Sequence, residues 1–182
     1  MKAVDALTME RFLEMATQRL QGEWVIIGGA ALTLMGVEER ATLDINLAGP
    51  DEATTADTLA LTEIAEELGL PVEAVNQAAS FFLRRIEGWQ RHLVTVRRSE
   101  YAEIFRPDTT LFVLLKLARL TETDLNDCLK VLALARRGAE QLDLDRLLAA
   151  VGDAVKASKS PAKLERLKRL KDELSVASDY GS

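Results

Sequence analysis

One stretch, residues 24–47, constrains the fold more than any other part of the 182-residue chain. It begins with four apolar residues, Trp24-Val-Ile-Ile27, and its β-branched run is typical of a short strand buried on both faces. The pair Gly28-Gly29 follows, and the backbone can turn sharply there because glycine has no Cβ. Residues 30–35 are mostly good helix formers. The stretch therefore predicts a strand, a tight turn and a short helix.

A second strand is predicted from Leu43 to Leu47, in which Asp44 and Asn46 alternate with apolar residues and share one face. A glycine turn that opens a helix offers N–H groups to an anion such as phosphate, although Gly-Gly after an apolar run is also common as a plain turn. Oxygen ligands at i and i+2 can hold a divalent cation beside that phosphate. These residues predict a nucleotide–metal site with one weakened ligand, because an asparagine brings no negative charge.

The pattern Gly28-Gly29 … Arg40-x-Thr42-x-Asp44-Ile45-Asn46 resembles the motif of the nucleotidyltransferase superfamily, which has a DNA polymerase β-like palm. It is most similar to minimal bacterial members, including the AbiE-type toxins. A weaker similarity covers residues 116–132, where a lysine precedes an acidic helix start. The resemblance implies an α/β (α+β) fold with a small mixed sheet flanked by helices. It implies a palm domain over residues 1–107 and a helical C-terminal region, residues 108–182, packed on it.

The same resemblance implies roles for particular residues. The implied nucleotide-binding residues are Gly28, Gly29, Arg40, Thr42 and Lys116. Asp44 is the implied catalytic residue, and Asp44 with Asn46 would bind Mg²⁺ or Mn²⁺. The chain departs from the family in two places: Asn46 stands where a second aspartate belongs, and no third aspartate is evident downstream. Loss of one such charge costs ~3 kcal/mol, or about 100-fold in rate, by analogy with the loss of one electrostatic donor.

Two functions are therefore predicted as alternatives. The first is a metal-dependent nucleotidyltransferase that moves a nucleoside monophosphate from a nucleoside triphosphate to an unknown acceptor, with weakened catalysis. The second is a catalytically inactive nucleotidyltransferase fold that acts as a nucleotide-sensing or protein-interaction module, with a toxin–antitoxin partner as one such context. The two substitutions that weaken the first motivate the second, so enzymatic activity stays open between them.

Later segments add three expectations. Residues 81–86, 92–96 and 101–105 are rich in aromatic and β-branched residues and predict strands. The resemblance places a third carboxylate in this region, but residues 92–96 offer only His92 and Thr95. The nearby acids are interpreted as surface charges; they are Glu87, Glu100 and Glu103.

The helical half opens with Asp108, a good N-cap, and a nearly continuous apolar run that contains Lys116. A lysine in such a helix either extends its ammonium to solvent or meets an anion, and both readings stay open. Thr123 is predicted to start the next helix, with Asp124 and Asp127 in its first turn, where carboxylates favour the helix dipole.

The final helix, from Ser160, carries leucines on one side and many lysines and arginines elsewhere. Such a helix can contact RNA phosphates, or can pack by its leucines and leave its charges in solvent. The net charge of −6 argues against a general nucleic-acid binder.

Composition limits the setting of the chain. No apolar run approaches the roughly 18 residues that span a bilayer, so no membrane association is predicted. The first residues lack the apolar core of a signal peptide. The single cysteine, Cys128, cannot form an internal disulfide and is expected to be a buried, inert thiol. A cytoplasmic protein is predicted.

Overall fold

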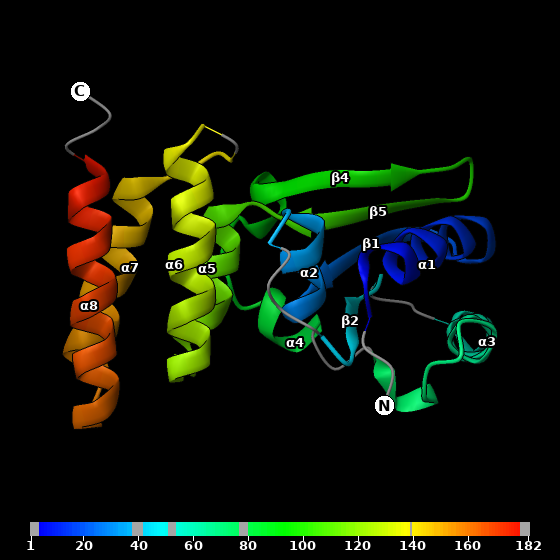
Figure 1. The fold of residues 1–182 in the computed structure, drawn as a ribbon, viewed down its shortest axis with the longest axis horizontal. Helices are drawn as coiled ribbons and strands as arrows, with labels where there is room; N and C mark the ends of the chain where they lie inside the picture. Colours follow the sequence, from blue (N-terminus) through cyan, green and yellow to red (C-terminus); the bar gives the residue numbers. More distant parts are fainter. Residues whose placement is uncertain (1–3, 38–41, 51–53, 77–79, 139, 179–182) are drawn as a thin grey trace. The chain divides into compact units, whose positions relative to one another are not determined.

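The computed structural model describes residues 4–37, 42–50, 54–76, 80–138 and 140–178. The chain divides into two compact units, Met1–Pro107 and Asp108–Ser182. The first combines a sheet with helices, and the second is entirely helical in its described part (Figure 1).

The first unit is built on a five-stranded mixed sheet with the strand order β3-β2-β1-β5-β4. The strands are β1 (Gly22–Ile27), β2 (Ile45–Ala48), β3 (Val75–Asn76), β4 (Leu93–Arg98) and β5 (Ala102–Pro107). The central strand β1 pairs antiparallel with β2 and parallel with β5, so the sheet is mixed. The helical elements are α1 (Ala6–Arg19), α2 (Gly29–Leu34), α3 (Thr55–Glu67), α4 (Ser80–Leu83) and the 3₁₀ turns η1 (Val72–Ala74) and η2 (Trp89–His92). The predicted small mixed sheet flanked by helices is confirmed.

The main core of this unit lies between one face of the sheet and the helices α1 and α3. Trp24 and Ile26 of β1 point into it and are fully buried, together with Phe12 of α1 and Ile64 of α3. The indole N–H of Trp24 donates to the Gln21 carbonyl at 2.9 Å, which satisfies the one polar group of that side chain. Since side chains alternate along a strand, the intervening residues of β1 face the other side of the sheet.

The prediction of a strand over residues 81–86 is wrong. The chain forms the short helix α4 there, then a turn at Gly88 with φ of +65°, and then η2. Leu83 is buried, whereas Phe81 and Phe82 stay 58% and 53% exposed. Aromatic residues alone suggested a strand, but strand propensity mainly reflects packing against neighbouring strands, and this segment packs as a helix against β2.

The second unit consists of four helices that lie side by side (Figure 1). They are α5 (Thr109–Leu117), α6 (Glu122–Arg136), α7 (Leu144–Ala157) and α8 (Pro161–Ser178). Asp108 caps α5 as predicted, accepting the Leu111 N–H at 2.8 Å. The start predicted for α6, Thr123, is one residue late: the helix begins at Glu122, with Thr121 as an N-cap that forms a capping box with Asp124. Burial raises the pKa of the Cys128 thiol, so it stays protonated.

The final helix packs by its leucines, with Leu167, Leu170 and Leu174 fully buried. Its basic residues are partly engaged within the unit: Lys163 donates to the Ala118 carbonyl at 2.7 Å and Arg166 to the Leu120 carbonyl at 2.6 Å. These bonds satisfy carbonyl groups just after α5, where cations are favoured. RNA contact through this helix stays a prediction. No helix in the described part of the chain is long and apolar enough to cross a membrane.

Candidate functional site

The predicted glycine turn joins β1 to α2. Gly28 is the N-cap of α2 and has φ of +73°, a conformation that residues with a side chain rarely adopt. A Cβ on Gly28 would also lie only 3.3 Å from Nδ2 of Asn46. Glycine is therefore needed here both for the backbone conformation and for the close approach of β2. Gly29 is the first residue of α2, and Gly28 has no side chain with which to cap it.

Asp44, Asn46 and Thr42 form one hydrogen-bonded group beside this turn. Asn46 lies opposite Ile27 in the β1–β2 register, which places it next to Gly28. Its Nδ2 donates to Oδ2 of Asp44 at 3.0 Å, and Oγ1 of Thr42 donates to Oδ1 of Asp44 at 3.2 Å. A carboxylate accepts only, so the amide must turn its NH₂ to Asp44 and its Oδ1 away.

The β2 strand begins one residue after Asp44, at Ile45, rather than at Leu43 as predicted. Thr42 instead forms an isolated antiparallel bridge with Val4, whose N–H donates to the Thr42 carbonyl at 2.8 Å. Asp44 therefore sits in a short irregular segment between two pairings, half-buried and held by its neighbours. The structure brings Gly28, Thr42, Asp44 and Asn46 together. Arg40 lies outside the described residues.

The donor set of this group fits one divalent cation better than two. Each Asp44 oxygen accepts one hydrogen bond and keeps a further lone pair for a cation. The Asn46 amide would have to flip, giving up its 3.0 Å bond to Asp44, before its Oδ1 could share that cation. Mg²⁺ is commonly held by one or two carboxylates with the remaining positions taken by phosphate and water. Among the described residues, no three histidine, cysteine or acidic side chains come together as a metal cluster. The described side chains therefore do not provide the three carboxylates that a pair of cations would need.

One cavity adjoins the group, and a second lies further along β2. Asp44 lines one of about 370 Å³ together with Leu43, Pro71, Glu73 and Ala74. Glu73 lies in η1, nearly thirty residues later in the chain, and no sequence motif pointed to it.

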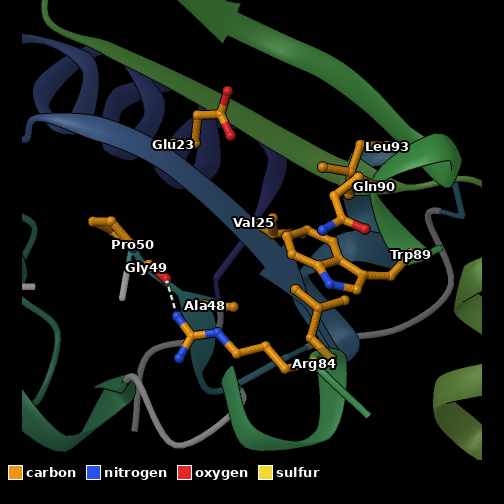
Figure 2. Close-up of a pocket in the computed structure, with 10 residues that line it drawn as sticks. Glu23, Val25, Ala48, Gly49, Pro50, Arg84, Trp89, Gln90 and Leu93 are labelled. Atoms are coloured by element: carbon orange, nitrogen blue, oxygen red, sulfur yellow. Dashed lines mark hydrogen bonds between the residues drawn. The ribbon is translucent and has the colours of Figure 1, made fainter. Parts of the chain in front are cut away.

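The second cavity, of about 330 Å³, lies over β1 and the end of β2 (Figure 2). Val25 and Ala48 line it from the sheet, and Trp89 and Arg84 from the segment that follows α4. Nη2 of Arg84 donates to the Gly49 carbonyl at 3.0 Å. The pocket could not be predicted once residues 81–86 had been assigned to a strand. The glycine at position 88, directly before Trp89, is the sequence feature that indicates a turn carrying an aromatic ring.

Lys116 lies in the second unit, where it is enclosed by acids of α6. Its Nζ donates to Oδ1 of Asp124 at 2.8 Å and to Oδ2 of Asp127 at 3.2 Å. The Lys116 side chain is 13% exposed, and those of Asp124 and Asp127 are 1% and 5% exposed. Arg119 also donates to Asp124, at 2.9 Å. The Lys116 ammonium therefore does not extend into solvent but meets two anions, the carboxylates of Asp124 and Asp127.

These contacts predict an acid-dependent loss of stability. Burial by itself would raise the pKa of the Asp124 carboxyl, but hydrogen bonds from Arg119, Lys116 and the Thr121 N–H outweigh burial and hold the pKa well below its usual range. A pKa lower in the folded state contributes stability above the unfolded value of about 3.9, and that stability is lost as pH falls through the folded pKa. We expect the free energy of unfolding in urea to decline from about pH 5 downwards, and to decline less steeply in Asp124→Asn.

The matched control for this titration is Asp153→Asn, since Asp153 is 77% exposed. Its pH dependence should equal that of the wild type. Equal slopes in Asp124→Asn and the wild type would show that the ion pairs of Asp124 do not stabilise the fold.

Comparison with known proteins identifies a family for most of the chain. Residues 3–176 match the family described as "Nucleotidyltransferase of unknown function (DUF6036)". No curated protein and no solved structure gives a significant match. The family match includes both the Gly28–Asn46 region and the helices of the second unit, so it extends well beyond the motif of residues 24–47. The chain belongs to this nucleotidyltransferase family.

Proposed function

We propose that the chain binds a nucleoside triphosphate with one divalent cation at Gly28, Gly29, Asp44 and Asn46, and transfers its nucleoside monophosphate slowly to an acceptor hydroxyl. The observation that carries this proposal is the position of the Asn46 amide. Its Nδ2 lies 3.0 Å from Oδ2 of Asp44. The same atom would lie only 3.3 Å from a Cβ placed on Gly28, so the amide also adjoins the glycine turn. An anion at the turn would thus lie beside a cation on Asp44.

The reaction balances without a further reactant. The acceptor oxygen forms a bond to the α-phosphorus while the bond from that phosphorus to pyrophosphate breaks. Pyrophosphate leaves with the electron pair, and the acceptor hydroxyl loses its proton to solvent. A bound Mg²⁺ or Mn²⁺ would supply positive charge to the phosphate oxygens.

The chain's own residues have simpler tasks. Backbone N–H groups at Gly28 and Gly29 would orient the phosphates. Asp44 carries the one negative charge of the group, and Thr42 holds that carboxylate in position through the 3.2 Å bond from its hydroxyl. Asn46 offers an amide oxygen but no charge, so cation binding should be weaker than at a pair of aspartates. Arg40 and Lys116 remain predictions as phosphate ligands, and the charge of Lys116 is already balanced by two carboxylates.

The test is calorimetric titration with ATP, GTP, CTP and UTP in Mg²⁺, in Mn²⁺ and in excess chelator. We expect micromolar binding that needs the metal and that weakens at least about tenfold in Asp44→Asn, the loss of one charged ligand being ~1.4 kcal/mol or more. Asp153→Asn removes the same charge from an exposed site and should bind as the wild type does. Absence of binding for every nucleotide, or binding indifferent to metal and to Asp44→Asn, would overturn the proposal.

The alternative of an inactive module has one observation in its favour. Thr42 and Asn46 already occupy both oxygens of Asp44 with internal hydrogen bonds, so the group is stable without a ligand. Metal-dependent nucleotide binding with no pyrophosphate release in Mg²⁺ or Mn²⁺ would favour a nucleotide sensor. If nucleotides change neither the melting temperature nor the affinity for a protein partner, a protein-interaction module would be favoured.

A further inference from the structure

The pocket in Figure 2 lies on the sheet face opposite the α1–α3 core. Trp24 and Ile26 point into that core, so Glu23 and Val25 on the same strand face the other way. Ala48 lines the pocket two residues beyond Asn46 on β2, and the alternation of side chains puts both on this face. At about 3.3 Å per residue, the pocket floor begins roughly 7 Å from Asn46.

The pocket combines an apolar floor with polar groups that lack partners. Val25, Ala48, Leu83 and Leu93 supply the apolar lining. Among the described residues, the side chains of Glu23, Trp89 and Gln90 make no hydrogen bond or ion pair. Figure 2 shows the Glu23 carboxylate on one side of Val25, and the Trp89 indole and the Gln90 amide on the other. A cavity of about 330 Å³ that is lined by both apolar and polar groups has room for a small molecule.

We propose that this pocket binds the base of the nucleotide and prefers guanine. The proposal rests on the proposed function, because the phosphates would lie at Gly28 and Asp44. The Trp89 ring offers a face for stacking, and base–aromatic stacking is the usual way in which proteins hold a single base. The guanidinium of Arg84, fixed by its bond to the Gly49 carbonyl, borders the same space.

The free carboxylate of Glu23 sets the preference. A carboxylate only accepts hydrogen bonds, and guanine presents two adjacent donors, N1–H and the exocyclic amino group. Uracil presents one N–H between two carbonyl oxygens, which a carboxylate repels. The carboxylate thus accepts from both guanine donors and faces carbonyl oxygens of uracil, so GTP should bind best and UTP worst.

The two tryptophans make the test direct. Trp24 is fully buried on the opposite face and its N–H is already bonded, whereas Trp89 lines the pocket. A change of tryptophan emission on adding nucleotide therefore reports Trp89. The probes are GTP, UTP, guanosine and inorganic tripolyphosphate, each with Mn²⁺ and with chelator, on the full chain. The variants are Trp89→Leu, Glu23→Gln and the control Glu66→Gln, an exposed glutamate of α3.

We expect GTP to quench the emission and to bind about tenfold or more tightly than UTP, with a similar loss of GTP affinity in Trp89→Leu. Tripolyphosphate should bind equally to the wild type and Trp89→Leu without changing emission. Glu23→Gln, an exposed and fold-neutral change, should bring the GTP to UTP ratio close to one, whereas Glu66→Gln should leave it unchanged.

The two proposals fail in different ways. Metal-dependent GTP binding with unchanged Trp89 emission, and with equal affinities in Trp89→Leu and Glu23→Gln, would overturn the base pocket and leave the proposed function standing. Absence of metal-dependent binding of tripolyphosphate and of every nucleotide would overturn the proposed function. In that case guanosine still tests the base pocket. Quenching of tryptophan emission by guanosine that is lost in Trp89→Leu would support the pocket, and the absence of any effect of guanosine would overturn it.

Discussion

Replacing Lys116 by methionine is expected to lower the free energy of unfolding by about 3–5 kcal/mol, because two buried carboxylates lose the ammonium that pairs with both of them. Asp124 and Asp127 are 1% and 5% exposed, and the Lys116 ammonium lies 2.8 and 3.2 Å from their oxygens. Methionine keeps most of the length of the side chain and removes the ammonium group, with its charge and its hydrogen-bond donors. Arg119 still pairs with Asp124 in the variant. Urea unfolding at pH 7 measures the change.

The control is Lys168→Met, an exposed lysine on α8, which should change stability by no more than about 0.5 kcal/mol. Adding Asp127→Asn to Lys116→Met should recover part of the loss, since it removes one of the two buried charges that Lys116 neutralises. A loss in Lys116→Met no larger than in the control would show that the buried ion pairs are energetically neutral. Nucleotide affinity of the folded variant gives a separate answer: an unchanged value assigns Lys116 to structure, and a large drop restores the predicted phosphate contact.

Replacing Asn46 by aspartate is expected to increase metal dependence sharply. The change removes the 3.0 Å donation to Asp44 and sets two carboxylates side by side, so the variant should be less stable than the wild type in chelator. Mg²⁺ or Mn²⁺ should reverse this, and raise the melting temperature more than it does in the wild type. If the missing charge limits transfer, pyrophosphate release should rise by up to about 100-fold, equivalent to ~3 kcal/mol.

Asn126→Asp is the matched substitution, because Asn126 is an exposed residue of α6. It should show no metal-dependent shift of melting temperature. If the metal-dependent shift of melting temperature in Asn46→Asp equals that in Asn126→Asp, Asp44 and residue 46 do not share a cation. That result would remove the main physical support for metal-dependent transfer.

The sequence alone determined the elements whose causes are local. The β-branched run before Gly28-Gly29 produces β1 and its turn, and the short helix follows from good helix formers. Asp108 caps its helix because the capping bond spans only three residues. The alternation of Asp44 and Asn46 placed both polar side chains on one side, and their hydrogen bond agrees with that placement.

Only the tertiary structure decided the features that depend on distant neighbours. The partners of Lys116 lie on the next helix, so the sequence left open whether its charge meets solvent or an anion. The pocket collects residues from β1, β2, β4 and the turn at Trp89, and packing against β2 turned residues 80–83 into a helix that local propensity did not predict. Local patterns fix backbone conformation over a few residues, whereas burial, ion pairing and cavities arise when segments far apart in the chain come together.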